Sequence, residues 1–200
     1  DKTFHLMRAL AQTANCAGLT DPGWISENPE YARDLCTAHG EFMERLSRCV
    51  WTSPETQQTY EQLMKWAEDR AKANYRVICI DPITAAAQTG KPWVEDNHFM
   101  QSAKKIATDY KCSIVLVTHP KAGTSAPDLN QLAGGQSFSR FAQTILWLEA
   151  HEPKESEMHT ICGRAKDTHN RTLHILKARN GKGQGANLAF EFNDNLRLSE

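Results

Sequence analysis

Two polar side chains that are able to do chemistry come directly after short apolar runs. Asp81 follows Val77-Ile-Cys-Ile, and His119 follows Cys112-Ser-Ile-Val-Leu-Val-Thr. Short β-branched runs of this kind are typical of buried parallel strands. In an open parallel α/β sheet the ligand binds beyond the carboxyl ends of the strands. We therefore expect Asp81 and His119 to face one crevice, and a nucleotide with its metal ion is the ligand we expect there.

Other residues meet further requirements of phosphoryl chemistry. That chemistry needs a carboxylate for Mg²⁺ and its water shell, a group that positions the attacking water, and cations on the γ-phosphate. Asp81 is the candidate for the metal, and Glu27, at the end of Gly23-Trp-Ile-Ser, is the candidate for the water. Lys177 and Arg179 share one face of an expected strand, so both side chains are able to reach one anion.

Each of these residues also has an ordinary structural explanation. A strand-end aspartate such as Asp81 occurs in many α/β proteins that are not ATPases. Glu27 precedes an expected helix, whose macrodipole favours a carboxylate. In the ordinary explanation His119 bonds only to a neighbouring loop, and Lys177 and Arg179 are solvated charges at a sheet edge. The residues alone leave these alternatives open.

The order of the expected elements is βα units first and hairpins last. Apolar spacing and turn residues predict helices at about 2–15, 30–46, 57–74 and 93–110, and a short helix from Ser137. Strands are expected at 23–27, 48–51, 75–81, 112–118 and 144–148. Antiparallel ribbon is expected at 158–162, 172–178, 187–192 and 196–198. We expect Ser53-Pro54-Glu-Thr to cap the third of the longer helices. The fold class is therefore α/β, and a chain of 200 residues is expected to form a single domain, 1–200.

Five motifs in this order resemble the RecA-like ATPase core of hexameric replicative helicases, most closely the RepA-type plasmid helicases and related phage ATPases. They are Trp24-Ile-Ser-Glu27-Asn-Pro, Val77-Ile-Cys-Ile-Asp81, Ile114-Val-Leu-Val-Thr-His119-Pro-Lys121, Gly134-Gly-Gln-Ser137 and Leu176-Lys177-Ala-Arg179-Asn-Gly181. The resemblance implies a P-loop NTPase fold, with a mostly parallel sheet flanked by helices and antiparallel hairpins at the C-terminal end.

The resemblance also implies a role for each candidate residue. Glu27 matches the catalytic carboxylate, and Asp81 matches the Walker B aspartate that holds Mg²⁺. His119 matches the sensor that couples the γ-phosphate to the DNA-binding loop. Lys177 and Arg179 match a basic pair that reaches into the ATP site of the neighbouring subunit.

The main departure from that family concerns its glycine-rich phosphate loop. The pattern G-x-x-x-x-G-K-[ST] does not occur in the sequence. The chain opens Asp1-Lys2-Thr3 and runs into an expected helix, as the end of such a loop does. We therefore expect the glycines directly upstream of Asp1, with Lys2 on the β/γ-phosphates and Thr3 on Mg²⁺. The alternative is an ordinary frayed terminus, and a chain truly without the loop would bind ATP weakly or not at all.

The function that the resemblance implies is an ATP-hydrolysing helicase or translocase that forms a hexameric ring on single-stranded DNA in replication. Loops after Asp81 and His119, with Lys91 and Lys121, are expected to contact DNA. A primase or a loader is a further expected partner. Two alternatives stay open: a RecA-like ATPase without translocation, such as a recombination mediator, and a degenerate non-catalytic nucleotide-binding protein.

Composition narrows the class of protein. The formal net charge is −1, so any contact with nucleic acid must come from a local patch. The six cysteines show no CxxC spacing, and we expect reduced thiols. No apolar run approaches the roughly 20 residues that cross a bilayer, and no secretion signal is visible. We expect a cytoplasmic protein, encoded by a bacterium, a phage or a plasmid, without contact to a membrane.

Overall fold

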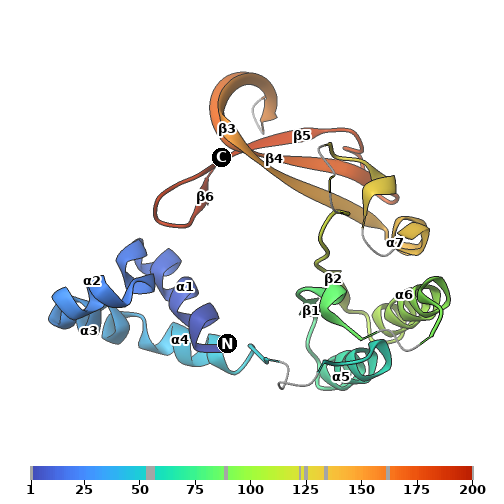
Figure 1. Ribbon diagram of the computed structural model, residues 1–200, viewed down its shortest axis with the longest axis horizontal. Coiled ribbons are helices and arrows are strands. Elements are labelled where there is room, and N and C mark those ends of the chain that lie inside the picture. The colour runs from blue at the N-terminus through green and yellow to red at the C-terminus, as the bar shows by residue number, and fades with distance from the viewer. Residues whose placement is uncertain are drawn as a thin grey trace. The chain divides into compact units, whose positions relative to one another are not determined.

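The computed structural model describes residues 2–52, 57–87, 90–121, 123, 126–132, 135–160 and 163–199. The chain divides into two compact units, and Figure 1 labels the elements that belong to them. The first comprises Asp1–Thr52, Leu148–Leu173 and Asn187–Glu200, and the second comprises Ser53–Trp147 and His174–Ala186. Each unit has a hydrophobic core of its own.

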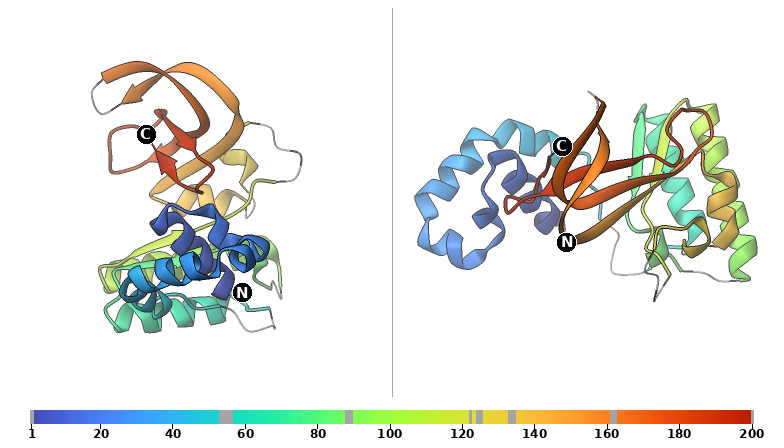
Figure 2. Two further views of the ribbon diagram at one scale, coloured as in Figure 1. Left: turned by 90° about the vertical axis from the view of Figure 1, so that its left-hand side faces the viewer. Right: turned by 90° about the horizontal axis from the view of Figure 1, so that it is seen from above.

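Helices dominate the N-terminal part of the first unit and gather in one cluster (Figure 2). They are α1 (Lys2–Ala14), η1 (Ala17–Thr20), α2 (Pro22–Glu27), α3 (Pro29–Ala38) and α4 (Gly40–Ser47). Their buried core consists of Leu10, Ala11, Leu19 and Ala32. The expected first helix is confirmed, and Asn15 ends it with a positive φ of 54°, a conformation that asparagine tolerates.

The strand expected at residues 23–27 is wrong, because this segment forms α2. The side chain of Asp21 accepts a hydrogen bond from the N–H of Gly23 at 2.8 Å, and Pro22 occupies the first turn. Both features start a helix. Glu27 is therefore the exposed last residue of a helix and does not close a strand.

The strand expected at residues 48–51 is also wrong. The N–H groups of Cys49 and Val50 both donate to the carbonyl oxygen of Leu46, at 2.8 and 3.1 Å, so the chain turns as it leaves α4. The single helix expected over 30–46 is divided into α3 and α4 at His39, the residue before Gly40. Glycine at that point weakens a continuous helix.

A parallel βαβ arrangement forms the centre of the second unit, as the sequence predicts. Its elements are α5 (Tyr60–Lys72), β1 (Val77–Ile80), η2 (Ile83–Ala85), α6 (Pro92–Asp109), β2 (Ser113–Leu116), η3 (Leu129–Gln131) and α7 (Gly135–Phe141). The strands β1 and β2 pair in parallel, with Ile78 opposite Ile114 and Ile80 opposite Leu116. Helices α5 and α6 lie side by side next to them (Figure 1).

Only one face of this parallel pair is buried. Ile78 is 3% exposed and Ile80 is 7% exposed, and both pack into the core that α5, α6 and α7 complete. On the opposite face Val77 is 65% exposed and Val115 is 46% exposed. The expectation of fully buried strands is therefore wrong, because the described helices α5 and α6 cover one side of the pair.

The C-terminal strands form a four-stranded sheet in the order β3-β4-β5-β6. Their bounds are Thr144–Thr160, Gly163–Ala178, Asn187–Phe192 and Leu198–Ser199, and β5 and β6 are antiparallel. The expected C-terminal hairpins are thus present, but β3 extends well beyond Leu148 through polar residues that lack an apolar pattern. Pro153 is tolerated because β3 is an edge strand. The parallel sheet is smaller than expected: within the described ranges its strands are β1 and β2.

Candidate functional site

The chain leaves β1 and β2 at the same edge of the parallel pair. The N–H of Val117 donates to the carbonyl oxygen of Ile80, and the N–H of Ile83 donates to the carbonyl oxygen of Val117, both at 2.9 Å. Asp81 is the first residue after β1, and His119 is the third residue after β2. Both residues are exposed. The structure therefore brings the carboxylate and the imidazole to one edge of the sheet, where ligands of α/β proteins bind.

The carboxylate of Asp81 forms no ion pair and no hydrogen bond with any other described residue. Its negative charge acts on the neighbouring strand residue Cys79. Partial burial raises the pKa of the Cys79 thiol, and the charge of Asp81 raises the pKa of that thiol further. Asp81 thus presents a carboxylate without a protein counterion in the described part of the chain.

This environment of Asp81 fits the requirements of Mg²⁺. That ion keeps several waters and takes only one or two protein carboxylates. A cluster of three or more His, Cys, Asp or Glu side chains placed for a metal is absent from the described residues, and a magnesium site does not require one. Asp81 would hold the water shell of the ion, and the ion would supply positive charge to phosphate oxygens.

Three other predicted site residues belong to the first unit. Lys2 and Thr3 begin α1, and Glu27 ends α2. Asp81 and His119 belong to the second unit. The structure describes each unit by itself, so the grouping of Lys2, Thr3 and Glu27 with Asp81 stays a prediction.

Lys177 and Arg179 meet at the C-terminal end of α7. The Nζ of Lys177 donates to the carbonyl oxygen of Ser139 and, at 3.4 Å, to that of Arg140. The guanidinium of Arg179 donates to the same Arg140 oxygen at 3.0 Å. Partial burial lowers the pKa of Lys177, and the positive charge of Arg179 lowers the pKa of Lys177 further. The pair shares one location, as strand spacing predicts, and its described partners are main-chain oxygens.

A second set of contacts fixes the turn that begins at Arg179, directly after β4. The N–H of Arg179 donates to the carbonyl oxygen of Gln143 at 2.9 Å, and Nδ2 of Asn180 donates to Oε1 of Gln143 at 2.8 Å. Sequence reasoning missed Gln143, because it lies 37 residues from Asn180 and no motif marks it.

The predicted DNA contacts occupy different environments. Lys91 is exposed at the residue before α6. Lys121 is bonded within its own loop: its N–H donates to the Gln131 carbonyl oxygen at 2.8 Å, and its Nζ donates to the Asn130 carbonyl oxygen at 2.6 Å. Several residues of the two predicted loops lie outside the described residues, namely 88, 89, 122, 124, 125, 133 and 134.

The Gly134-Gly-Gln-Ser137 motif lies partly in α7. Gly134 falls outside the described residues, and Gln136 and Ser137 belong to the helix. The Oγ of Ser137 donates to Oδ1 of Asn97 on α6 at 3.0 Å. The motif therefore anchors the first turn of α7 to α6.

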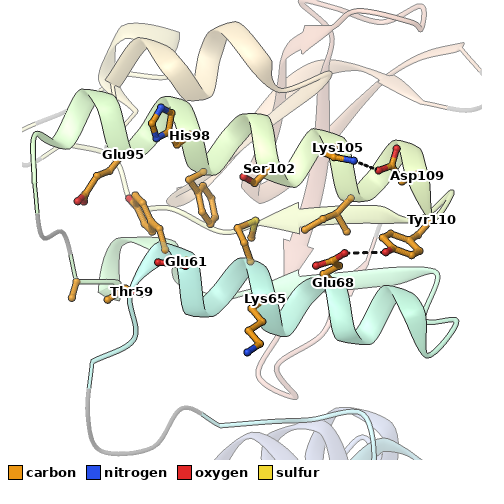
Figure 3. A pocket seen from close by; sticks show the side chains of 15 residues that line it. Thr59, Glu61, Lys65, Glu68, Glu95, His98, Ser102, Lys105, Asp109 and Tyr110 are labelled. Atoms are coloured by element: carbon orange, nitrogen blue, oxygen red, sulfur yellow. Dashed lines mark hydrogen bonds and ion pairs between the residues drawn. The ribbon is translucent and has the colours of Figure 1, made fainter.

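A cavity of about 730 Å³ lies between α5 and α6 (Figure 3). Two hydrogen bonds cross between the segments that line it, from the Tyr60 hydroxyl to Asp96 at 3.1 Å and from the Tyr110 hydroxyl to Glu68 at 2.9 Å. Its lining residues do not include Asp81 or His119. This cavity is therefore distinct from the strand edge that carries the predicted chemistry.

Solved structures with a similar fold are found among replicative helicases. No protein-family model matches the sequence, and no curated protein matches it. Among solved structures, a DnaB-like replicative helicase described with its interactions with primase matches with a TM-score of 0.65 at 12% identity over 94% of this chain. The ATPase domain of G40P matches with a TM-score of 0.65 at 13% identity over 99% of this chain. The fold resembles that of helicase ATPase domains.

The matches cover only part of each of the two solved chains. This chain spans 45% of the DnaB-like helicase chain and 70% of the G40P ATPase domain chain. At 12–13% identity the likeness concerns the fold alone. It supports a mixed α/β fold similar to that of replicative helicase ATPase domains, and the resemblance to RepA-type helicases stays a prediction.

Proposed function

We propose that this chain is the ATPase core of a motor that acts as a ring on single-stranded DNA in replication. The observation that carries the proposal is the position of Asp81 and His119 at one edge of two adjacent parallel strands, in a fold similar to helicase ATPase domains. Phosphoryl transfer depends mainly on positioning and charge, and a strand edge of this kind offers both.

Each residue at the edge has a defined task in this proposal. Asp81 holds the water shell of Mg²⁺, which neutralises charge on the phosphates when bound. His119 donates a hydrogen bond with one ring nitrogen and accepts one with the other, so it is able to report the state of a phosphate to the loop beyond it. Lys2 and Thr3 would hold the β/γ-phosphates and the ion. Glu27 would orient the attacking water from a helix end, and a Glu27→Gln variant that binds ATP but does not hydrolyse it would support this role.

The assembly is part of the proposal. Lys177 and Arg179 would act on the nucleotide of a neighbouring subunit, which requires a ring, and we propose six subunits. Lys91 and Lys121 would contact the DNA backbone, where each phosphate bound adds salt-dependent affinity. The DnaB-like structure was described with primase, and a primase or a loader is the partner we propose for this chain, in the cytoplasm.

Turnover of ATP with and without DNA tests this function. The protein is used at its full natural length, and phosphate release is measured with and without single-stranded DNA. The motor predicts ATP turnover that rises when DNA is added. Turnover that DNA leaves unchanged would favour an ATPase without translocation, and absence of both binding and turnover would contradict the proposal.

A further inference from the structure

The last turn of α7 holds two cations that come from a distant strand. Helix-end carbonyl oxygens lack partners within the helix and carry the negative end of the helix dipole. Lys177 donates to the oxygens of Ser139 and Arg140, and Arg179 donates to the oxygen of Arg140. The two side chains therefore cap this helix end.

The carbonyl oxygens of Ser139 and Arg140 are neutral, so they compensate the two positive charges only weakly. Among the described residues, neither Lys177 nor Arg179 forms an ion pair with a carboxylate. Partial burial and, after it, the positive charge of Arg179 lower the pKa of Lys177, so both disfavour its charged form. An anion that reached this location would offset the repulsion between the two cations.

We propose that Lys177 and Arg179 exchange the carbonyl oxygens of α7 for a phosphate anion, and that this exchange releases the last turn of α7. The inference rests on the proposed function, in which the nucleotide of a neighbouring subunit supplies the phosphate. The bonds to the carbonyl oxygens have a charged donor and a neutral acceptor, and a phosphate oxygen adds the attraction of opposite charge to each bond. The guanidinium fork of Arg179 also matches phosphate geometry better than a single carbonyl oxygen.

The remaining contacts of the turn after β4 do not depend on charge. The N–H of Arg179 and the amide of Asn180 bond to Gln143, which lies beyond the end of α7. A phosphate that draws away the two cationic side chains leaves these bonds in place. The exchange is therefore a side-chain movement, and the backbone of Arg179 stays where it is.

The released turn belongs to a helix whose other end is fixed. Ser137, near the start of α7, bonds to Asn97 of α6. The segment before α7 is the loop that begins after His119. The basic pair thus regulates the C-terminal turn of a helix that follows the predicted sensor, and occupancy at the subunit interface changes the order of that turn.

Amide hydrogen exchange in the folded chain tests the exchange of partners. The N–H of Ala142 donates to the Phe138 carbonyl oxygen at 3.1 Å and reports on the last turn of α7, and the N–H of Arg179 reports on the Gln143 contact. Inorganic tripolyphosphate is added, with potassium chloride at matched ionic strength as the reference. We expect exchange at Ala142 to rise about five-fold, the size of a lost favourable contact between cations and a helix C-terminus, and exchange at Arg179 to stay unchanged.

Two variants make the result decisive. The double variant Lys177→Gln, Arg179→Gln should show fast exchange at Ala142 without tripolyphosphate and no response to it. The Lys182→Gln variant removes an exposed cation that has no described contact with α7, and it should respond like the wild type.

Unchanged exchange at Ala142 in the wild type, or a response that persists in the double variant, would overturn the inference. No ATP hydrolysis enters this experiment. A chain that lacks ATP turnover is able to pass it, and an active ATPase is able to fail it, so failure of the inference and failure of the proposed function are distinguishable.

Discussion

The N–H of Val117 in the segment after β2 donates to the carbonyl oxygen of Ile80, the last residue of β1, at 2.9 Å. This bond extends the parallel pairing one step beyond the strands and aligns the points at which the chain leaves them. Asp81 and His119 therefore start from the same edge, although 38 positions separate them in the sequence.

Replacement of Asp81 by Asn should reduce ATP turnover about 10- to 100-fold and leave the fold intact. The amide fills nearly the same volume but carries no charge to hold the water shell of Mg²⁺. Phosphate release measures the effect, and circular dichroism checks the fold. Turnover within a few-fold of the wild type would remove Asp81 from the metal site.

The thiol of Cys79 provides an independent test of the charge on Asp81. Partial burial, and after it the charge of Asp81, raise the pKa of this thiol. Asp81→Asn should lower the pKa of Cys79 while the effect of burial remains, so alkylation by iodoacetamide at moderately alkaline pH should be faster in the variant. The same dependence of alkylation rate on pH in the wild type and in Asp81→Asn would contradict the effect of the Asp81 charge on Cys79.

The same thiol gives a pH dependence of stability with a defined sign. A pKa raised in the folded state means that the contribution of Cys79 is fully present below the pKa of the unfolded thiol and is lost as pH rises through the folded pKa. Stability of the wild type should therefore fall relative to Cys79→Ser in the alkaline range. Chemical unfolding at a series of pH values measures this difference, and a difference that is constant across the alkaline range would count against it.

Two tyrosines that bond carboxylates across α5 and α6 make a matched pair. The Tyr60 hydroxyl bonds to Asp96, which is 5% exposed, and the Tyr110 hydroxyl bonds to Glu68, whose side chain is 40% exposed. Tyr60→Phe should lower the free energy of unfolding by about 1.5–3 kcal/mol, because it removes a hydrogen bond to a buried carboxylate. Tyr110→Phe is the control and should have a smaller effect, because water replaces the lost partner. Equal effects would mean that the Tyr60 bond is no more protected than the Tyr110 bond.

The carboxylate of Glu68 on α5 gives a prediction for stability at acidic pH. The hydrogen bond from Lys72, and after it the one from Tyr110, lower the pKa of Glu68. A lowered folded pKa means that the stabilisation is present above the pKa of unfolded glutamate and is lost as pH falls through the folded pKa. Lys72→Gln should therefore destabilise slightly at neutral pH and have no effect in strong acid, as unfolding midpoints measure. The effect is small because the pair is exposed to solvent.

The sequence predicts the second unit better than the first. Apolar runs before Asp81 and His119 correctly indicate β1 and β2, and the spacing between them correctly indicates α6. In contrast, Gly23-Trp-Ile has β-forming residues but begins after Asp21-Pro22, and that local cap prevails over propensity. A capping signal was present in the sequence at that point and would have predicted the helix.

The sequence predicts those residues of the candidate site whose position depends on a local pattern of apolar and polar residues. Strand ends identify Asp81 and His119, because a polar residue after an apolar run marks the edge of a sheet. The contacts of Lys177 with Ser139 and of Arg179 with Arg140 join residues 38 and 39 positions apart. No periodicity encodes such pairs, since tertiary packing sets them.

Mixing of two inactive variants tests most directly whether one ATP site is shared between subunits. Asp81→Asn lacks the metal carboxylate, and Arg179→Ala lacks the cation that stabilises transition-state charge in the neighbour, an effect worth roughly 10³–10⁵ in rate for arginine fingers. Each variant alone should bind ATP and show little turnover. In mixed assemblies that exchange subunits, some interfaces combine an intact Asp81 with an intact Arg179, so turnover should partly recover. Absence of recovery at every mixing ratio, in assemblies shown to exchange subunits, would contradict the account.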